Sequence, residues 1–141
     1  MAEITLSNDI VQYIAVASKH IKTSIIDCLE TDDKLVFVVG KGQLGVAIGS
    51  NAKNLDKLRN LFKKNIRFVE FDKDEKKFIY NLFRPYKINN VNFEGNDDAH
   101  VARVEVDSRD KSRIIGKGGK NIELIRKLAQ RHHSIKDVQI V

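Results

Sequence analysis

The sequence repeats itself at an offset of 67 residues, and this repeat restricts the possible folds more than any other feature. Gly49 and Gly116 occupy the same place in the two copies. The same offset aligns further positions, in the pairs Ile21 and Ile88, Ile26 and Phe93, Val39 and Val106, Ile48 and Ile115, and Lys53-Asn54-Leu55 and Lys120-Asn121-Ile122. The register changes only before the last strand, where the second copy has extra residues. The repeat predicts two similar domains, residues 1–72 and 73–141.

Hydrophobic periodicity gives each copy the same order of elements: helix, strand, strand, helix, glycine turn, helix, strand. The expected strands cover residues 21–29, 35–39 and 66–71 in the first copy and 88–94, 101–106 and 138–141 in the second. The expected inner helix faces are Val11, Ile14, Ala15 and Ser18 near the N-terminus, and Leu55, Leu58, Leu61 and Phe62 after the glycine turn. Asp72 and Glu75 have the spacing of a capping box at the start of the second copy.

The glycine turn of the second copy suits a chain of phosphates. It runs from Gly116 to Gly119, and its terminal glycines allow a positive φ and a close approach of the backbone to a ligand. The helix that starts near Lys120 directs its first N–H groups and positive dipole end to the same place. The first copy has Gly49-Ser50-Asn51-Ala52 instead. Ala52 is compatible with binding if its position is already helical, so this copy is either a weaker site or purely structural.

A G-x-x-G turn between two helices resembles the loop of KH domains, which clamps about four nucleotides of single-stranded nucleic acid. Only one helix and one strand follow each turn, as in the type II arrangement of the KH fold. The resemblance implies an α+β chain of two tandem type II KH domains, each with a three-stranded sheet and helices on one face. Two such domains without a Gly/Ser linker resemble the paired KH region of the NusA family, in the short form of its archaeal members.

The NusA resemblance implies RNA binding in transcription elongation or termination, with RNA polymerase as a candidate partner. The residues themselves include no carboxylate pair, Ser-His set or Cys-His set that suggests catalysis, so we expect no enzymatic activity. Two alternatives stay open: a KH factor of the ribosome or of RNA processing, and an adaptor that works through protein contacts alone. The expected RNA-binding residues of the second copy are Arg109, Arg113, Ile115, Gly116, Lys117, Gly118, Gly119, Lys120 and Ile122. Those of the first copy are Lys41, Ile48, Gly49, Ser50, Asn51, Ala52 and Lys53. Leu55 is expected to join the three isoleucines as an apolar floor for the bases.

Charge supports a polyanionic partner. The net charge is +6. Segment 41–64 has six Lys/Arg and one Asp, and segment 107–131 has eight Lys/Arg and three acidic residues, so each carries +5 and contains one of the turns. A lone cysteine and four histidines without metal-ligand spacing predict no disulfide, metal or cofactor. The polar N-terminus and the lack of long apolar runs predict a cytoplasmic protein without membrane contact. We expect a monomer.

One motif points elsewhere. Gly40, Gly42 and Gly45 follow a strand with the spacing of a dinucleotide-binding fingerprint. The second copy does not repeat these glycines, and Gly49 interrupts the helix that a dinucleotide fold requires. We therefore interpret this segment as a connector between a strand and a helix.

Overall fold

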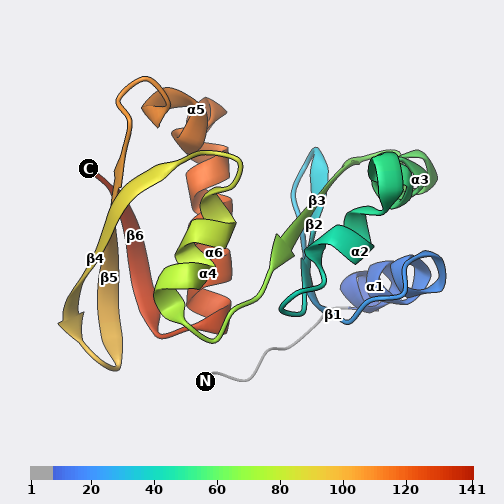
Figure 1. Ribbon diagram of the computed structural model, residues 1–141, viewed down its shortest axis with the longest axis horizontal. Coiled ribbons are helices and arrows are strands. Elements are labelled where there is room, and N and C mark those ends of the chain that lie inside the picture. The colour runs from blue at the N-terminus through green and yellow to red at the C-terminus, as the bar shows by residue number, and fades with distance from the viewer. Residues whose placement is uncertain (1–7) are drawn as a thin grey trace. The chain divides into compact units, whose positions relative to one another are not determined.

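The computed structural model describes residues 8–141, and the chain divides into two compact units between Asp72 and Lys73. Each unit is α+β, with a three-stranded sheet covered on one face by helices (Figure 1). Within residues 8–141, no helix is both long and apolar enough to cross a membrane.

The first unit places its sheet strands in the order β1-β2-β3. Its elements are α1 (Asn8–His20), β1 (Ile25–Glu30), β2 (Lys34–Val39), α2 (Leu44–Ile48), the 3-10 turn η1 (Ser50–Ala52), α3 (Lys53–Phe62) and β3 (Asn65–Glu70). Strand β1 is antiparallel to β2, and β3 is parallel to β2. The central strand is the most hydrophobic part of the chain: Leu35, Phe37 and Val39 are fully buried against the helices. Val36 and Val38, which alternate with these residues, are fully buried as well, and burial of both faces of the strand explains its nearly continuous apolar sequence.

The second unit repeats this topology with the order β4-β5-β6. Its elements are α4 (Glu75–Phe83), β4 (Ile88–Asn96), β5 (Ala99–Val106), α5 (Lys111–Ile115), the 3-10 turn η2 (Lys117–Gly119), α6 (Lys120–His132) and β6 (Ile135–Ile140). Strand β4 is antiparallel to β5, and β6 is parallel to β5. The observed order confirms the prediction of two tandem KH folds.

The inner face of α1 differs from the predicted one. Ala17 is fully buried, and Ile10, Tyr13 and Ile14 pack on the same core, whereas Val11 is 49% exposed. Apolar residues lie on both sides of this helix, so the periodicity alone allowed two faces. The edge-to-face contact of Tyr13 with Phe62, at 5.5 Å between ring centroids, fixes the choice.

The repeat also changes register earlier than predicted. Ile25 faces Val39 across the first hairpin, and Ile88 faces Val106 across the second. Ile25, and not Ile21, is therefore the counterpart of Ile88, because the second hairpin is longer. Both hairpins have a β-bulge directly after this first pair.

Helix α4 begins at a different cap from the predicted one. The Asp74 carboxylate accepts the Lys77 backbone N–H at 3.1 Å and is the N-cap. Asp72 is 6% exposed and lies 3.7 Å from the Lys41 ammonium. The Glu75 carboxylate contacts the ring Nε2 of the buried His100, which ties the start of α4 to the second hairpin.

Candidate nucleic-acid interface

The second glycine turn joins the short helix α5 to the long helix α6 through three residues in unusual conformations. Gly116 has φ 80° and ψ 168°, Gly118 has φ 65°, and Gly119 has φ 75°. A Cβ at Gly118 or Gly119 would have no neighbour within 4 Å, so the space where a side chain would begin is open at both residues. The turn thus presents bare main chain at the N-terminal end of a 13-residue helix.

An asparagine amide locks this turn. Asn121 Nδ2 donates a hydrogen bond to the Ile114 carbonyl oxygen at 2.7 Å and so ties the first turn of α6 to the end of α5. The same side chain occupies the space beside Gly116, where an added Cβ would lie 2.9 Å from the Asn121 Cβ. A helix of five residues is too short to be stable by itself, and this bond fixes its position relative to α6.

The first copy has a similar bond, whose acceptor lies one residue earlier in the short helix. Asn54 Nδ2 donates to the Val46 carbonyl oxygen at 3.1 Å, and Gly49 lies against Asn54. The dihedral angles of Gly49, φ 80° and ψ 167°, match those of Gly116 within a degree. Sequence analysis did not assign this role to the asparagines, although their recurrence two residues after each turn was the available signal.

The first turn has the same left-handed backbone as the second, although Asn51 and Ala52 replace Gly118 and Gly119. Asn51 has φ 54°, and Ala52 has φ 58° and ψ 29°. Ala52 is therefore not in the right-handed helical conformation. Its predicted compatibility with binding depends on that conformation. Asparagine adopts this region more readily than most residues, whereas alanine is strained there.

Basic side chains surround the second turn. Lys117 and Lys120 lie in and directly after the turn and are exposed, as is Arg113 on α5. Arg109, in the loop before α5, is held by Asp107: its Nη2 lies 3.0 Å from Oδ2, and its Nε lies 3.3 Å from Oδ1. These hydrogen bonds from Arg109 lower the pKa of the Asp107 carboxyl and raise the pKa of the guanidinium. Part of the charge of Arg109 is thus already compensated within the loop.

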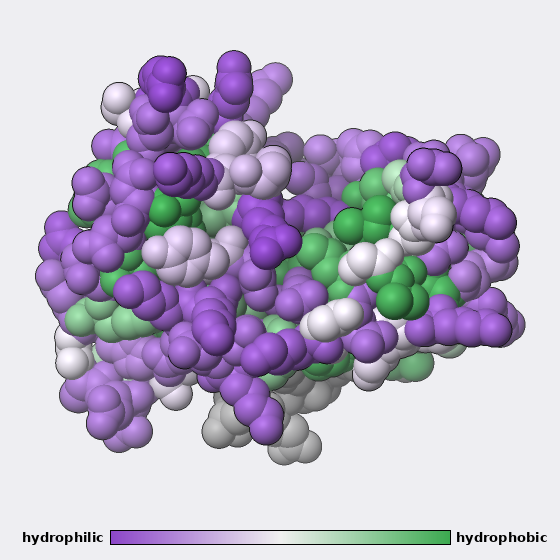
Figure 2. Space-filling model, viewed as in Figure 1, coloured by the Kyte–Doolittle hydropathy of each residue, from purple (hydrophilic) through white to green (hydrophobic). Residues whose placement is uncertain are grey.

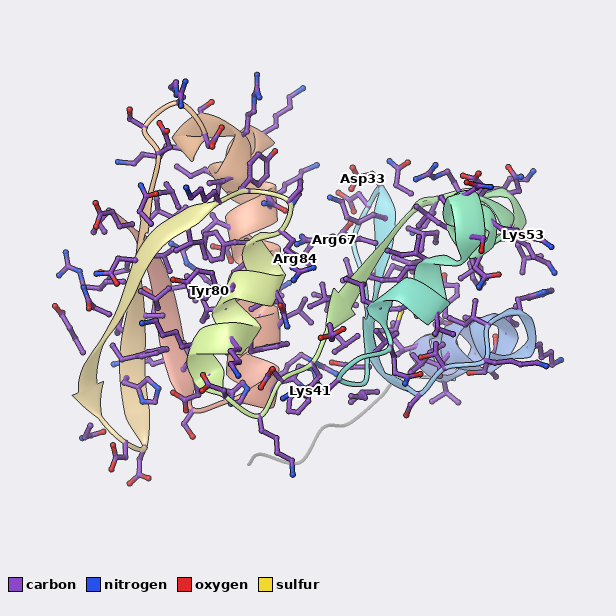
Figure 3. The ribbon with its side chains drawn as sticks, viewed as in Figure 1. Asp33, Lys41, Lys53, Arg67, Tyr80 and Arg84 are labelled. Atoms are coloured by element: carbon purple, nitrogen blue, oxygen red, sulfur yellow. The ribbon has the colours of Figure 1, made fainter. Side chains whose placement is uncertain are left out.

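The first copy presents fewer charges. Lys53 is exposed at the start of α3, and Lys41 precedes α2 (Figure 3). Helix α2 itself has no charged residue, and Val46 on it is 52% exposed. Apolar surface gathers over α2 in the space-filling view (Figure 2). This copy therefore differs from the second in both charge and polarity next to the turn.

The predicted apolar floor divides into two groups. Ile115, Ile48 and Leu55 are partly exposed beside their turns, and Ile48 and Leu55 also pack against the core of the first unit. Ile122 is 5% exposed and belongs to the core of the second unit. Its side chain packs on the buried side of α6, so it is not accessible to bases.

The Gly40-Gly42-Gly45 segment forms a tight turn, in which the Gln43 N–H donates to the Gly40 carbonyl at 3.0 Å. The helix that follows ends at Ile48, after five residues. This geometry agrees with a connector and lacks the long helix of a dinucleotide fold. In the part of the chain that the structure describes, no group of His, Cys, Asp and Glu could hold a metal ion.

Comparison with protein families assigns both units. Residues 75–141 match the NusA-like second KH domain, and residues 9–73 match the KH domain family. The crystal structure of APE1850 superimposes with a TM-score of 0.80 at 28% identity and covers 96% of this chain and all of that one.

Relatives that match nearly the whole of this chain include archaeal proteins. A probable transcription termination protein NusA of Halobacterium salinarum is 36% identical over 97% of this chain and 98% of its own length. Proteins of the same name from Methanocaldococcus jannaschii and Thermoplasma acidophilum are 28% and 26% identical; they are covered over 77% and 97% of their lengths. With tandem KH folds, two similar glycine turns and a relative that is 36% identical over 97% of this chain, the chain belongs to the archaeal NusA-like family.

Proposed function

We propose that this protein binds single-stranded RNA through its two glycine turns, with the second turn as the stronger site, and that it acts in transcription elongation or termination. The observation that carries the proposal is the turn from Gly116 to Gly119. It combines open backbone, the start of a long helix and two exposed lysines. These are the properties that hold a run of phosphates.

Each part of the second site has a distinct role in this proposal. The main chain at Gly118 and Gly119 approaches the phosphates, and Lys117 and Lys120 neutralise them. Ile115 offers a partly exposed apolar surface for a base. Because base edges are accessible only in unpaired RNA, the site favours single strands over duplex.

The first site extends the bound strand and holds it less tightly. Its turn has the same backbone, but it has Ser50 and Asn51 in place of Lys117 and Gly118, and the methyl group of Ala52 where Gly119 leaves open space. Val46 and Ile48 favour apolar contacts with bases over contacts with phosphates. RNA longer than one site should therefore bind more tightly until both sites are filled.

A matched pair of substitutions tests the assignment of the stronger site. Gly118→Asp and Asn51→Asp each add one carboxylate at the corresponding position, and both backbones are left-handed, at φ 65° and 54°. Asparagine and aspartate tolerate this region, so the folds should persist. We expect Gly118→Asp to reduce affinity for a short single-stranded RNA by at least about tenfold and Asn51→Asp to reduce it less. Equal losses would show that the two turns contribute equally, and no loss in either variant would remove both turns as the site.

Salt dependence tests the electrostatic part. Each phosphate contact on a single strand adds about 0.7 to the slope of log affinity against log salt concentration. We expect a steep slope for the parent and a shallower one for Gly118→Asp. An affinity that is flat between low and moderate salt would contradict phosphate recognition and would favour the alternative of an adaptor without RNA contacts.

The transcription role rests on the names of the relatives, which are described as probable transcription termination proteins. Affinity purification of the tagged protein from archaeal cells, followed by mass spectrometry, should identify RNA polymerase subunits among its partners. Co-purification of ribosomal proteins without polymerase would instead favour the ribosomal alternative. An in vitro elongation assay should then show a change in pausing or termination that Gly118→Asp abolishes.

A further inference from the structure

We infer that the outward face of α4 is a second RNA-contacting surface, separate from the glycine turns; the inference rests on the proposed binding of single-stranded RNA. The surface consists of Lys76, Lys77, Tyr80 and Arg84, and we call these residues the α4 stripe. All four are exposed, and Tyr80 and Arg84 are marked on the helix and at its end in Figure 3. Lys73 precedes the helix and is also exposed.

The stripe lies opposite the buried side of the helix. At 3.6 residues per turn, positions 76, 77 and 80 fall within a sector of about 100° around the helix, and Arg84 is the C-cap residue directly after it. The core side of α4 consists of Phe78, Ile79, Leu82 and Phe83, which are all at most 1% exposed. Because every residue of the stripe faces away from this core, packing of the second unit does not explain its composition.

The nearby acidic residues are engaged elsewhere. Asp74 caps the helix, and Glu75 contacts His100. Among the ion pairs within residues 73–141, none includes Lys73, Lys76 or Lys77. Lys76 and Lys77 also stand in the first turn of the helix, where the positive end of the helix dipole disfavours cations. Two lysines in this position reduce the stability of the helix, and a bound polyanion would compensate for them.

The first copy is an internal control. Helix α1 has the same place in its unit, and its exposed residues include Val11, Gln12, Ala15 and Ser18, with Asp9 and Lys19 as charged exceptions of opposite sign. A KH domain of this chain therefore folds with an outward face that is largely neutral. The row of cations on α4 is a property of the second copy and not a requirement of the fold.

The stripe combines the two chemical features that bind single strands. Its lysines can neutralise phosphates, and the ring of Tyr80, 36% exposed, lies between them and Arg84 as a surface on which a base can stack. Helix α4 is about 13 Å long, which corresponds to about four phosphates at the spacing of a stacked strand.

The stripe can be reached from the second turn. Phe78, near the start of α4, contacts His132 and His133 at the end of α6, with ring centroids 5.7 and 5.2 Å apart. The two helices therefore run in opposite directions (Figure 1). The Arg84 end of α4 is the end nearer to the start of α6 and its glycine turn, so an RNA strand that leaves the turn meets the stripe there first.

The test compares a double variant with a control of equal charge. Lys76→Gln with Lys77→Gln removes two charges from the stripe, and Lys19→Gln with Lys136→Gln removes two exposed charges elsewhere. For a single-stranded RNA of about 12 nucleotides, we expect the stripe variant to lower the salt slope by about 1.4 and the affinity by about fivefold per lysine at 0.1 M salt. The control variant should change both much less. Tyr80→Ala should cost about another fivefold through lost stacking, whereas Tyr80→Phe should bind like the parent.

RNA length separates the stripe from the turn. An RNA of about four nucleotides fills one KH site, so the stripe variant should bind it like the parent while Gly118→Asp binds it poorly. If the stripe variant and its control bind the longer RNA equally, the inference is wrong and the proposed function stands. If the parent binds neither RNA, the proposed function fails and the inference fails with it. Circular dichroism of each variant verifies that α4 is still folded.

Discussion

The strained alanine of the first turn yields the sharpest prediction: Ala52→Gly should stabilise the protein. Ala52 has φ 58° and ψ 29°, in the left-handed region that costs a residue with a Cβ about 1–2 kcal/mol. Glycine removes this cost but makes the unfolded chain more flexible, which offsets about 0.4–1 kcal/mol. The net expected gain is about 0.5–1 kcal/mol in the free energy of unfolding of the first unit.

The gain should be visible in two measurements. For a domain of this size, 1 kcal/mol shifts the melting temperature by about 4–8 °C. Native-state hydrogen exchange assigns the change to one unit, because peptides of residues 8–72 should gain protection and peptides of residues 73–141 should not. Removal of the methyl group should also raise the affinity of the first site for RNA.

The same substitution in a helix is the control. Ala15 is exposed in the middle of α1, where glycine costs about 1 kcal/mol. Ala15→Gly should therefore destabilise the unit that Ala52→Gly stabilises. In the second unit, Gly119→Ala should destabilise, through the backbone alone, because its added Cβ has no neighbour within 4 Å. Loss of stability in Ala52→Gly, as in Ala15→Gly, would refute the strain argument.

Two further predictions concern side-chain contacts. Asn121→Asp replaces the amide that donates to the Ile114 carbonyl by a carboxylate that repels it. The substitution should lower the free energy of unfolding by about 1–3 kcal/mol and weaken RNA binding. Unchanged urea unfolding and RNA affinity would show that the bond does not hold the turn. Glu30 accepts a hydrogen bond from Lys64 and another from Tyr13, each at 2.8 Å. Both bonds lower the pKa of Glu30 below the ordinary 4.5, and the bond from Lys64 has the larger effect. The contribution of Glu30 to stability is therefore present above pH 4.5 and is lost as the pH falls further. The difference in unfolding free energy between the parent and Glu30→Gln, measured at each pH, should decrease in acid. A difference that does not change with pH would contradict this linkage.

Sequence reasoning identified the elements of the fold because the repeat supplied two readings of each one. It failed where a pattern allowed two solutions. The apolar residues of α1 permitted two faces, and only the contact of Tyr13 with Phe62 selects between them. Likewise, Asp72 and Asp74 both precede α4, and the hydrogen bond to Lys77 decides which one is the cap. Such choices depend on partners distant in sequence or on local backbone angles, which composition does not encode.

The site was predicted in part for a similar reason. Glycines and lysines at the turns carry a local signal, and the structure places Lys117, Lys120 and Lys53 on the surface, as expected. Burial of Ile122 and the left-handed angle of Ala52 are consequences of tertiary packing, so they could not be foreseen. The partnership of Arg109 with Asp107 was overlooked, although the two residues are only two positions apart.

The bulges in the two hairpins affect whether strands of one domain can pair wrongly with the sheet of the other. During synthesis and refolding, a strand of one copy could pair with the sheet of the other and produce an exchanged dimer or a tangled monomer. Strands β1 and β4 lie at the sheet edges, where such exchange would begin, and each has a bulge that disrupts regular pairing. The hairpins also differ in length, so a strand of one copy cannot replace its counterpart without losing pairs. The difference between the two hairpins thus disfavours strand exchange between the domains, whereas the two glycine turns have nearly the same backbone conformation.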